Sequence, residues 1–283
     1  MITFATVGVV GGGTMGSGIA YEVMRKTEAR VIVREVDERA LDRAKSLIGG
    51  YVERPVAKGQ VTRDIADGWL ARVSYTTDIA DLAAADIVVE AVFEDSDLKR
   101  GVFQQLSAAC REDAILASNT SGLSITTIAA ASTHPERVIG LHFFNPVPAM
   151  KLVEIIRAYQ TSDATIEAAR AFCAALGKET VLAKDYPGFI TTRIGMAMLA
   201  EAVRCLEEGV GTATDIDKGI KLGYNFPMGP LELADLVGID VLLHILEANT
   251  HLLGDRFLPS PLLRQMVAAG HLGRKSGQGF YKY

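Results

Sequence analysis

A glycine-rich loop between two apolar runs is the feature that most constrains the fold of this chain. "FATVGVV" is short, apolar and rich in β-branched residues, "TMGSGIAYEVMRK" has helical spacing, and "ARVIVRE" is a second apolar run. Strand, loop, helix and strand in this order predict a βαβ unit. The loop contains GxGxxG as Gly11, Gly13 and Gly16, which in this context is typical of a dinucleotide-binding turn.

Each glycine has a separate physical task in such a turn. Gly11 permits the tight turn, Gly13 lets the backbone approach a pyrophosphate, and Gly16 lets the helix pack closely on the strand. Thr14 and Met15 open the helix, where free backbone amides and the positive end of the helix dipole favour phosphate groups. We therefore expect Thr14 and Met15 to belong to the cofactor site as well.

The second apolar run ends in Glu35, nineteen residues after Gly16. Dinucleotide-binding folds carry a carboxylate at this place, which accepts hydrogen bonds from the ribose hydroxyls and repels a 2′-phosphate. Glu35 therefore favours NAD over NADP. Arg34 lies beside it, and because a guanidinium can serve a 2′-phosphate, NADP stays open as the alternative.

The rest of the first two thirds of the chain predicts an α/β fold. Residues 38–71 form two charged helical patterns with a break near "RPVAKGQVT", which indicates an inserted helical hairpin. Apolar strands separated by helical patterns predict a Rossmann-type, mostly parallel sheet with helices on both faces. The later strand-like runs are "ADIVVEAV", "AILAS", "RVIGLHFF", "KLVEII" and "ETVLA".

Beyond "KDYPG" the pattern is helical nearly to the end. We expect an NAD-binding domain over residues 1–185 and an all-α domain over residues 186–283. "GPLELADLVGIDVLLHILEANTHLLG" reads as one helical segment, and Ser260 before Pro261 is a good helix start. The helix from Phe189 is apolar on several sides, so an all-α core or a subunit interface must cover it.

Composition narrows the class of protein. A length of 283 residues suits about two domains, and a net charge of −5 with a pI near 5.6 argues against a nucleic-acid or anionic-membrane binder. The three cysteines form no CxxC, which indicates reduced thiols in a cytoplasmic protein. Residues 1–21 carry no charge, but a glycine cluster and the lack of a basic start argue against a signal peptide or membrane span. We predict no metal site.

Polar residues stand where two of the predicted strands end. "AILAS" runs into Asn119, Thr120 and Ser121, and His142 lies at the end of "RVIGLHFF". Ligands in open α/β sheets bind beyond the carboxyl ends of the strands, so we expect these residues at the meeting point of nicotinamide and substrate. A polar loop that merely caps the next helix is the alternative for residues 119–121.

His142 and Glu154 are ionisable groups set among large apolar residues. A dehydrogenase that acts on an alcohol needs a base for the hydroxyl proton, and imidazole suits this role near neutral pH. Glu154, on the next strand, can pair with the other ring nitrogen and raise the basicity of the ring. A purely structural pair, or two unrelated buried groups, is the alternative.

Six blocks carry a family resemblance: "GVVGGGTMGSGIA", "ASNTSGLSI", "GLHFFNPVPAMKLVEII", "DYPGF", "GIKLGYNFPMGPLELADLVGID" and "GRKSGQGFYKY". In this order and spacing the chain resembles the L-3-hydroxyacyl-CoA dehydrogenase family over essentially its whole length. Its single-function 3-hydroxybutyryl-CoA dehydrogenase members are the most similar.

The resemblance implies NAD-dependent oxidation of an (S)-3-hydroxyacyl-CoA, or the reverse reaction, in a homodimer that forms through the C-terminal domain. His142 matches the general base, Glu154 its partner, and Ser121 the serine that hydrogen-bonds the substrate oxygen and the nicotinamide site. Lys58 matches a lysine that contacts CoA. Matches to dinucleotide-binding positions are Gly11, Gly13, Gly16, Glu35, Glu94, Lys99, Asn145 and Lys275.

One departure concerns the substrate site. Where the family usually has "PGFIVNR", this chain has "PGFITTR", so Thr192 replaces an asparagine that would help to hold the substrate's 3-oxygen. A lost hydrogen bond in a dry site costs about 1 to 3 kcal/mol, so rate or substrate preference can differ. A related hydroxyacid dehydrogenase acting on a free sugar acid, and a non-catalytic crystallin-like relative, are the two alternative functions.

Overall fold

The first of two compact units is built on one eight-stranded sheet. The computed structural model describes residues 4–283, and the chain divides into units Met1–Phe189 and Ile190–Tyr283. The strand order is β3-β2-β1-β4-β5-β6-β7-β8, and only the β6–β7 pair is antiparallel, so the predicted mostly parallel sheet is confirmed. The strands are β1 (Thr6–Val10), β2 (Arg30–Arg34), β3 (Val73–Thr76), β4 (Ile87–Glu90), β5 (Ile115–Ser118), β6 (Val138–Phe143), β7 (Leu152–Arg157) and β8 (Glu179–Lys184).

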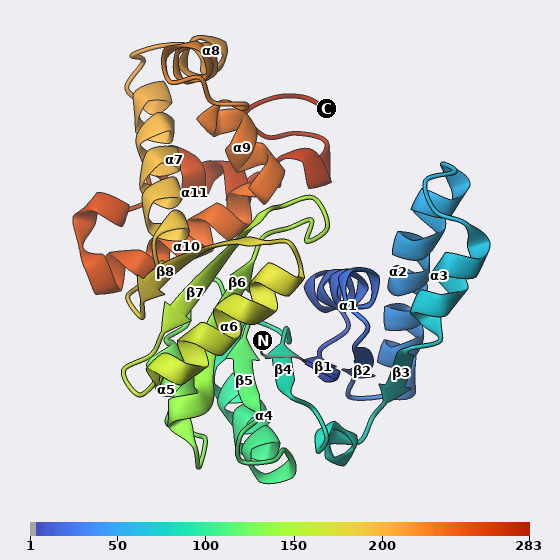
Figure 1. Cartoon of the computed structure of the whole chain (residues 1–283). Coiled ribbons are helices and arrows are strands. Elements are labelled where there is room, and N and C mark those ends of the chain that lie inside the picture. Colours follow the sequence, from blue (N-terminus) through green and yellow to red (C-terminus); the bar gives the residue numbers. More distant parts are fainter. Residues whose placement is uncertain (1–3) are drawn as a thin grey trace. The chain divides into compact units, whose positions relative to one another are not determined.

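Helices cover both faces of this sheet (Figure 1). Alternating strand residues serve two cores: Val9 and Val89 pack with α1 and α6, whereas Val10 and Val88 pack with α4 and α5. Successive side chains of a strand point to opposite faces, which is why the strands read as continuous apolar runs. The helices of this unit are α1 (Thr14–Lys26), α2 (Glu38–Ala57), α3 (Arg63–Leu70), α4 (Ser96–Ala109), α5 (Ile125–Ala129) and α6 (Asp163–Ala175), with 3₁₀ turns η1 (Ile79–Leu82) and η2 (Pro135–Arg137).

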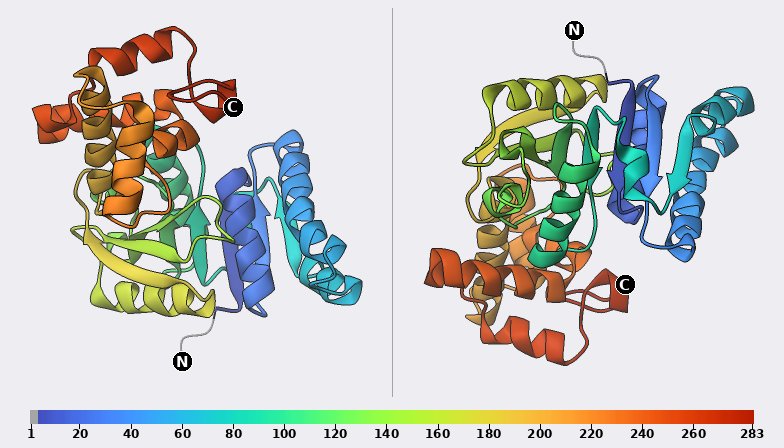
Figure 2. Two further views of the ribbon diagram at one scale, coloured as in Figure 1. Left: turned by 90° about the horizontal axis from the view of Figure 1, so that it is seen from above. Right: turned by 90° about the horizontal axis from the view of Figure 1, so that it is seen from below.

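The predicted helical hairpin is formed by α2 and α3, which lie side by side beyond β2 and β3 (Figure 2). The Asp37 carboxylate caps α2 by accepting from the Ala40 amide, and the Thr62 hydroxyl caps α3. The strand β3, Val73–Thr76, was not predicted. It has four residues, none of them fully buried, at the edge of the sheet, so it lacks the apolar run that marks the other strands.

The second unit is all-α, as predicted. Residues such as Leu199, Leu231 and Leu246 form its core. The segment expected as one helix is two, because Gly238 has a φ of 106°, a left-handed conformation that ends α9 and that glycine adopts at little cost. The helices are α7 (Thr191–Glu207), α8 (Ala213–Gly223), α9 (Pro230–Val237), α10 (Ile239–Leu253) and α11 (Pro261–Ala268), with 3₁₀ turns η3 (Asp255–Phe257) and η4 (Arg274–Ser276).

Two buried carboxylates organise this second unit. Asp217 of α8 accepts from the amides of Leu231 and Glu232 at 2.8 and 2.9 Å, so it caps the start of α9 from a different helix. Asp235 of α9 accepts from the amides of Phe280 and Tyr281 at 2.9 and 3.0 Å. Both acids thus satisfy backbone amides that would otherwise be buried without a partner, and they tie the last residues to the helices.

Candidate functional site

The glycine loop lies where β1 ends and α1 begins, and its geometry needs glycine. Gly11 has a φ of 92°. A Cβ on Gly16 would lie 1.8 Å from the Gly11 carbonyl oxygen, whereas a Cβ on Gly13 would meet nothing within 4 Å. Gly11 therefore serves the turn, Gly16 serves the close packing of helix on strand, and the space beside Gly13 is open.

The start of α1 has free amides. Its N-cap, Gly13, supplies no side-chain hydrogen bond, whereas side chains cap the other α-helices of the first unit, α2 to α6. The amides of Thr14 and Met15 thus point from a positive dipole end toward open space, an arrangement that suits phosphate oxygens.

Glu35 follows β2 directly and lies against the glycine loop. Its Oε1 accepts from the Gly12 amide at 2.6 Å and its Oε2 from the Val36 amide at 3.2 Å. Each carboxylate oxygen has two lone pairs, so both retain capacity to accept from ribose hydroxyls. The neighbouring Arg34 donates from Nε to the Thr77 carbonyl oxygen at 3.3 Å, which holds its side chain along the sheet edge.

A cleft of about 320 Å³ lies beyond the carboxyl ends of β4, β5 and β6. This is the edge at which open α/β sheets bind ligands, and Met15 of the glycine-loop helix contributes to the same wall. Its other lining residues come from the last two positions of β6 and from the segments that follow the three strands: Ala91, Val92, Glu94, Asn119, Ser121, His142, Phe143, Phe144 and Asn145.

His142 and Glu154 are direct cross-strand partners in the antiparallel β6–β7 pair. The His142 Nδ1 lies 2.7 Å from Glu154 Oε2, and the acid is fully buried. An ionised carboxylate only accepts, so Nδ1 carries the proton and Nε2 is left as the basic nitrogen of a neutral ring. The predicted pairing is present, and the histidine lines the cleft.

Glu94 organises the loop after β5. Its Oε1 accepts from the Ser121 amide at 3.0 Å and from the Thr120 hydroxyl. Asn119 Oδ1 accepts from the Phe143 amide at 2.9 Å, which joins this loop to the end of β6. These bonds hold Ser121 beside His142 in the wall of the cleft.

Lys99 lies beneath the cleft, not in it. Its side chain is 1% exposed, and its Nζ lies 2.6 Å from Glu90 Oε1 and 3.4 Å from Glu94 Oε2. Glu90, the last residue of β4, also accepts from the Ser118 hydroxyl at 2.7 Å. The sequence interpretation missed Glu90 and Ser118, although an acid at a strand end, as at Glu35, is a signal that could have identified Glu90.

Lys58, Thr192 and Lys275 are not among the residues that line this cleft. Lys58 is exposed at the end of α2. Thr192 and Lys275 belong to the second unit: Thr192 lies in the first turn of α7, and Lys275 Nζ lies 2.7 Å from Asp240 Oδ2. Asn145, by contrast, lines the cleft.

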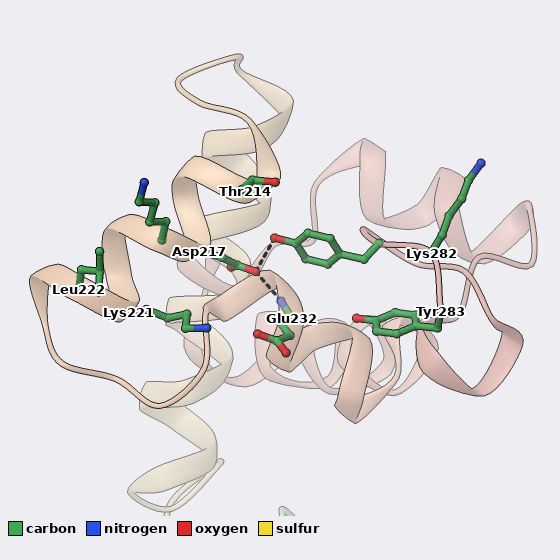
Figure 3. Close-up of a pocket in the computed structure, with 9 residues that line it drawn as sticks. Thr214, Asp217, Lys221, Leu222, Glu232, Lys282 and Tyr283 are labelled. Carbon is green, nitrogen blue, oxygen red and sulfur yellow. Dashed lines mark hydrogen bonds between the residues drawn. The ribbon is translucent and has the colours of Figure 1, made fainter.

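The second unit has a larger cavity, of about 550 Å³, between α8, α9 and the chain end. Its buried acid, Asp217, already accepts from backbone amides and from the Tyr281 hydroxyl at 2.7 Å (Figure 3). Glu232 pairs with Arg274, and the Lys282 amine points away from the cavity (Figure 3). The smaller cleft is therefore the candidate site, because it alone of the two combines a base with open backbone amides.

Among residues 4–283, no cluster of histidine, cysteine or acidic side chains is close enough to hold a metal ion. In the same part of the chain, no helix is both long and apolar enough to cross a bilayer.

Both halves of the chain match families of known proteins. A family model described as 3-hydroxyacyl-CoA dehydrogenase, NAD binding domain, matches residues 6–186. One described as 3-hydroxyacyl-CoA dehydrogenase, C-terminal domain, matches residues 188–283. A probable 3-hydroxybutyryl-CoA dehydrogenase of Deinococcus radiodurans is 48% identical, covering 98% of this chain and 99% of its own.

Further relatives agree over the full length. A 3-hydroxybutyryl-CoA dehydrogenase of Bradyrhizobium diazoefficiens is 45% identical over 98% of this chain and 94% of its own. The crystal structure of (S)-3-hydroxybutyryl-CoA dehydrogenase from Ralstonia eutropha superposes with a TM-score of 0.95 at 42% identity, covering 99% of each chain. The cleft, its histidine base and these full-length matches agree, and this chain belongs to the 3-hydroxyacyl-CoA dehydrogenase family.

Proposed function

We propose that this protein is an NAD-dependent 3-hydroxyacyl-CoA dehydrogenase that interconverts a short-chain (S)-3-hydroxyacyl-CoA, such as 3-hydroxybutyryl-CoA, and the 3-ketoacyl-CoA. The observation that carries the proposal is the His142–Glu154 pair, with the imidazole in the wall of a cleft that begins at the glycine-loop helix. The full-length similarity to 3-hydroxybutyryl-CoA dehydrogenases supports the short-chain substrate.

The glycine loop and Glu35 fit NAD. The open space at Gly13 and the uncapped amides of Thr14 and Met15 suit a pyrophosphate. Glu35 would accept from the adenosine ribose, and its charge would repel the 2′-phosphate of NADP. When bound, NAD supplies the acceptor for the hydride that leaves the substrate's C3 carbon.

His142 would take the hydroxyl proton on Nε2 as the C3–H bond breaks, so the alcohol becomes a ketone and the ring becomes an imidazolium. Glu154 would stabilise that cation and keep the proton on Nδ1, which leaves Nε2 free to act. Ser121 would donate to the substrate's 3-oxygen. Asn119 and Asn145 would position the nicotinamide side of the cleft.

The proposal also assigns roles to two residues of the second unit and to one residue of the hairpin. We assign Thr192 to the substrate's 3-oxygen, Lys275 to the cofactor and Lys58 to CoA, on the family resemblance. The division into an NAD-binding domain of residues 1–185 and a helical substrate and dimerisation domain of residues 186–283 is part of the same proposal. The boundary between the two family models, at residues 186–188, supports it.

Oxidation of NADH, followed by its absorbance, tests the function with acetoacetyl-CoA and free acetoacetate as substrates in parallel. We expect turnover of the thioester and little or none of the free acid. Replacement of NADH by NADPH should lower kcat/KM because of Glu35. Equal rates with both substrates would contradict the CoA assignment, and a preference for NADPH would point to Arg34 as a phosphate ligand.

We further propose that the protein is a homodimer and that it works in a reducing compartment. Apolar side chains on the second unit are exposed, including Ile194, Leu236 and Leu252, which supports association through these helices. Light scattering of the purified protein would measure the mass directly. The free thiols Cys110 and Cys173 are buried, as suits a protein of the cytoplasm.

A further inference from the structure

Three charged side chains, Glu90, Lys99 and Glu94, form a network that connects the sheet to the cleft. The Lys99 ammonium donates to Glu90 Oε1 at 2.6 Å and to the Val92 carbonyl oxygen at 3.3 Å, and it forms an ion pair with Glu94 Oε2 at 3.4 Å. An ammonium that is 1% exposed needs this compensation, because burial of an unpaired charge is costly.

Glu90 is the end of this network that lies away from the cleft. It is fully buried and accepts from Lys99, from the Val92 amide at 2.7 Å and from the Ser118 hydroxyl at 2.7 Å. These donors come from α4, from the β4–α4 loop and from β5, so the Glu90 carboxylate joins three elements. It does not line the cleft.

Glu94 is the end of the network that reaches the cleft. Its side chain is 43% exposed and lines the cleft. Lys99 holds one of its oxygens, and the Thr120 hydroxyl and the Ser121 amide hold the other. The direction of this carboxylate therefore depends on the position of the Lys99 ammonium, which Glu90 sets.

We infer that Glu90 is a positioning residue for dinucleotide binding: it anchors Lys99, and Lys99 orients the Glu94 carboxylate in the cleft. The inference rests on the proposed function. If the Glu90 charge is removed, Glu94 is the only anion left for Lys99, so the ammonium moves toward it. Glu94 is then drawn out of its bonds with Thr120 and Ser121, and the cofactor loses an ordered wall.

The test measures the Kd for NADH by fluorescence titration, together with Tm, for Glu90→Gln. Glutamine keeps the size of the side chain and can still accept from Ser118, but it does not neutralise Lys99. We expect the Kd for NADH to rise about tenfold, by analogy with the loss found when the hydrogen-bonding partners of metal ligands are removed. The KM for acetoacetyl-CoA should change much less.

A second buried pair in the same unit provides the matched control. Glu22 is 1% exposed, lies 3.3 Å from Lys178 and 2.6 Å from Arg25, and does not line the cleft. Glu22→Gln should lower Tm and leave the Kd for NADH unchanged. If Glu90→Gln lowers Tm but binds NADH as tightly as this control does, Glu90 is only structural and the inference fails.

The double variant Glu90→Gln/Lys99→Met keeps the test decisive if the single variant folds poorly. It removes both buried charges, and replacement of a buried ion pair by neutral groups is often tolerated. We expect Tm to recover while the Kd for NADH stays raised, because Glu94 has lost its cation. Recovery of both would overturn the inference. Failure of the unaltered protein to bind NADH would instead overturn the proposed function.

Discussion

Both units of this protein bury carboxylates, but they give them different partners. In the helical unit, Asp217 and Asp235 accept only from backbone amides and tyrosine hydroxyls. In the sheet unit, Glu154 meets an imidazole and Glu90 meets an ammonium. The amide donors fix the fold of the helical unit, whereas the His142 imidazole lines the cleft and the Lys99 ammonium also pairs with Glu94, which lines it. Burial of an acid alone therefore does not identify a catalytic group.

Tyr281 and His142 illustrate the difference between a structural and a catalytic partner of a buried acid. Burial, and next the hydrogen bond to Asp217, raise the pKa of the Tyr281 phenol well above its ordinary value. The phenol therefore keeps its proton throughout the physiological pH range. His142 also pairs with a buried acid, but its ring has a second nitrogen, Nε2, that the bond to Glu154 does not occupy.

The largest expected effect comes from removal of the base in the sheet unit. His142→Gln should lower kcat by about 10² to 10⁴, because general base catalysis is lost. NADH binding, measured by fluorescence, should persist. Wild-type turnover by this variant would remove His142 from the mechanism.

Glu154→Gln tests the partner instead of the base. An amide in place of the carboxylate no longer stabilises the imidazolium, so we expect kcat to fall by about 10- to 100-fold. Steady-state kinetics and a thermal melt measure both properties. A lower Tm with an unchanged kcat would mean that the pair is structural.

Asp217→Asn is the corresponding change in the helical unit. The amide can accept through only one oxygen, so several bonds to a buried anion are lost, and we expect about 2 to 3 kcal/mol less stability in urea. The kcat per folded molecule should not change. A lower kcat at full stability would break the comparison between the two units.

Glu35→Ala tests cofactor selectivity. We expect the KM for NAD to rise about tenfold, the value of one or two hydrogen bonds to a charged group, with the KM for the acyl-CoA unchanged. Steady-state kinetics with NAD and NADP measures both. If the KM for NAD stays the same, the carboxylate does not contact the ribose.

The smallest expected effect concerns Asp240. Burial alone would raise the pKa of this acid, but hydrogen bonds from Lys275 and from the Val241 amide outweigh it, so the pKa is lowered. The resulting stability is present above the ordinary carboxyl pKa and is lost as pH falls through the lowered pKa. Asp240→Asn should cost about 0.5 kcal/mol at pH 7 and nothing in strong acid, as urea titrations at both pH values would measure.

Much of the fold could be predicted from the sequence, because the central strands β1, β4, β5, β6 and β7 are largely buried on both faces and read as apolar runs. The glycine loop, the hairpin and the all-α second half were likewise visible as patterns. The edge strand β3 and the split at Gly238 were not predicted, because a half-exposed strand carries little apolar signal and one glycine rarely ends a helical pattern. The opposite direction of β7 also has no signature in composition.

The candidate site was predicted in part. His142 and the residues after β5 stand at strand ends, where the topology of the sheet brings them together, and the antiparallel pairing of β6 and β7 sets Glu154 opposite His142. Lys99 was predicted to bind the cofactor, and it lies 1% exposed beneath the cleft. Its partner Glu90 is 28 residues from Ser118 in the chain, and only the pairing of β4 with β5 makes them neighbours, so local patterns could not identify this connection.

The β6–β7 register also bears on how this scaffold tolerates changes in length. Side chains alternate along a strand, so removal of one residue before His142 in β6 would turn the imidazole toward the layer of α1 and α6, away from Glu154. Removal of one residue from β7 on the near side of Glu154 would turn the carboxylate in the same way. Insertions in the connection, residues 144–151, leave both strands in phase. Changes in length should therefore be made in this connection, beyond the cleft-lining Phe144 and Asn145, and both strands kept at their present length.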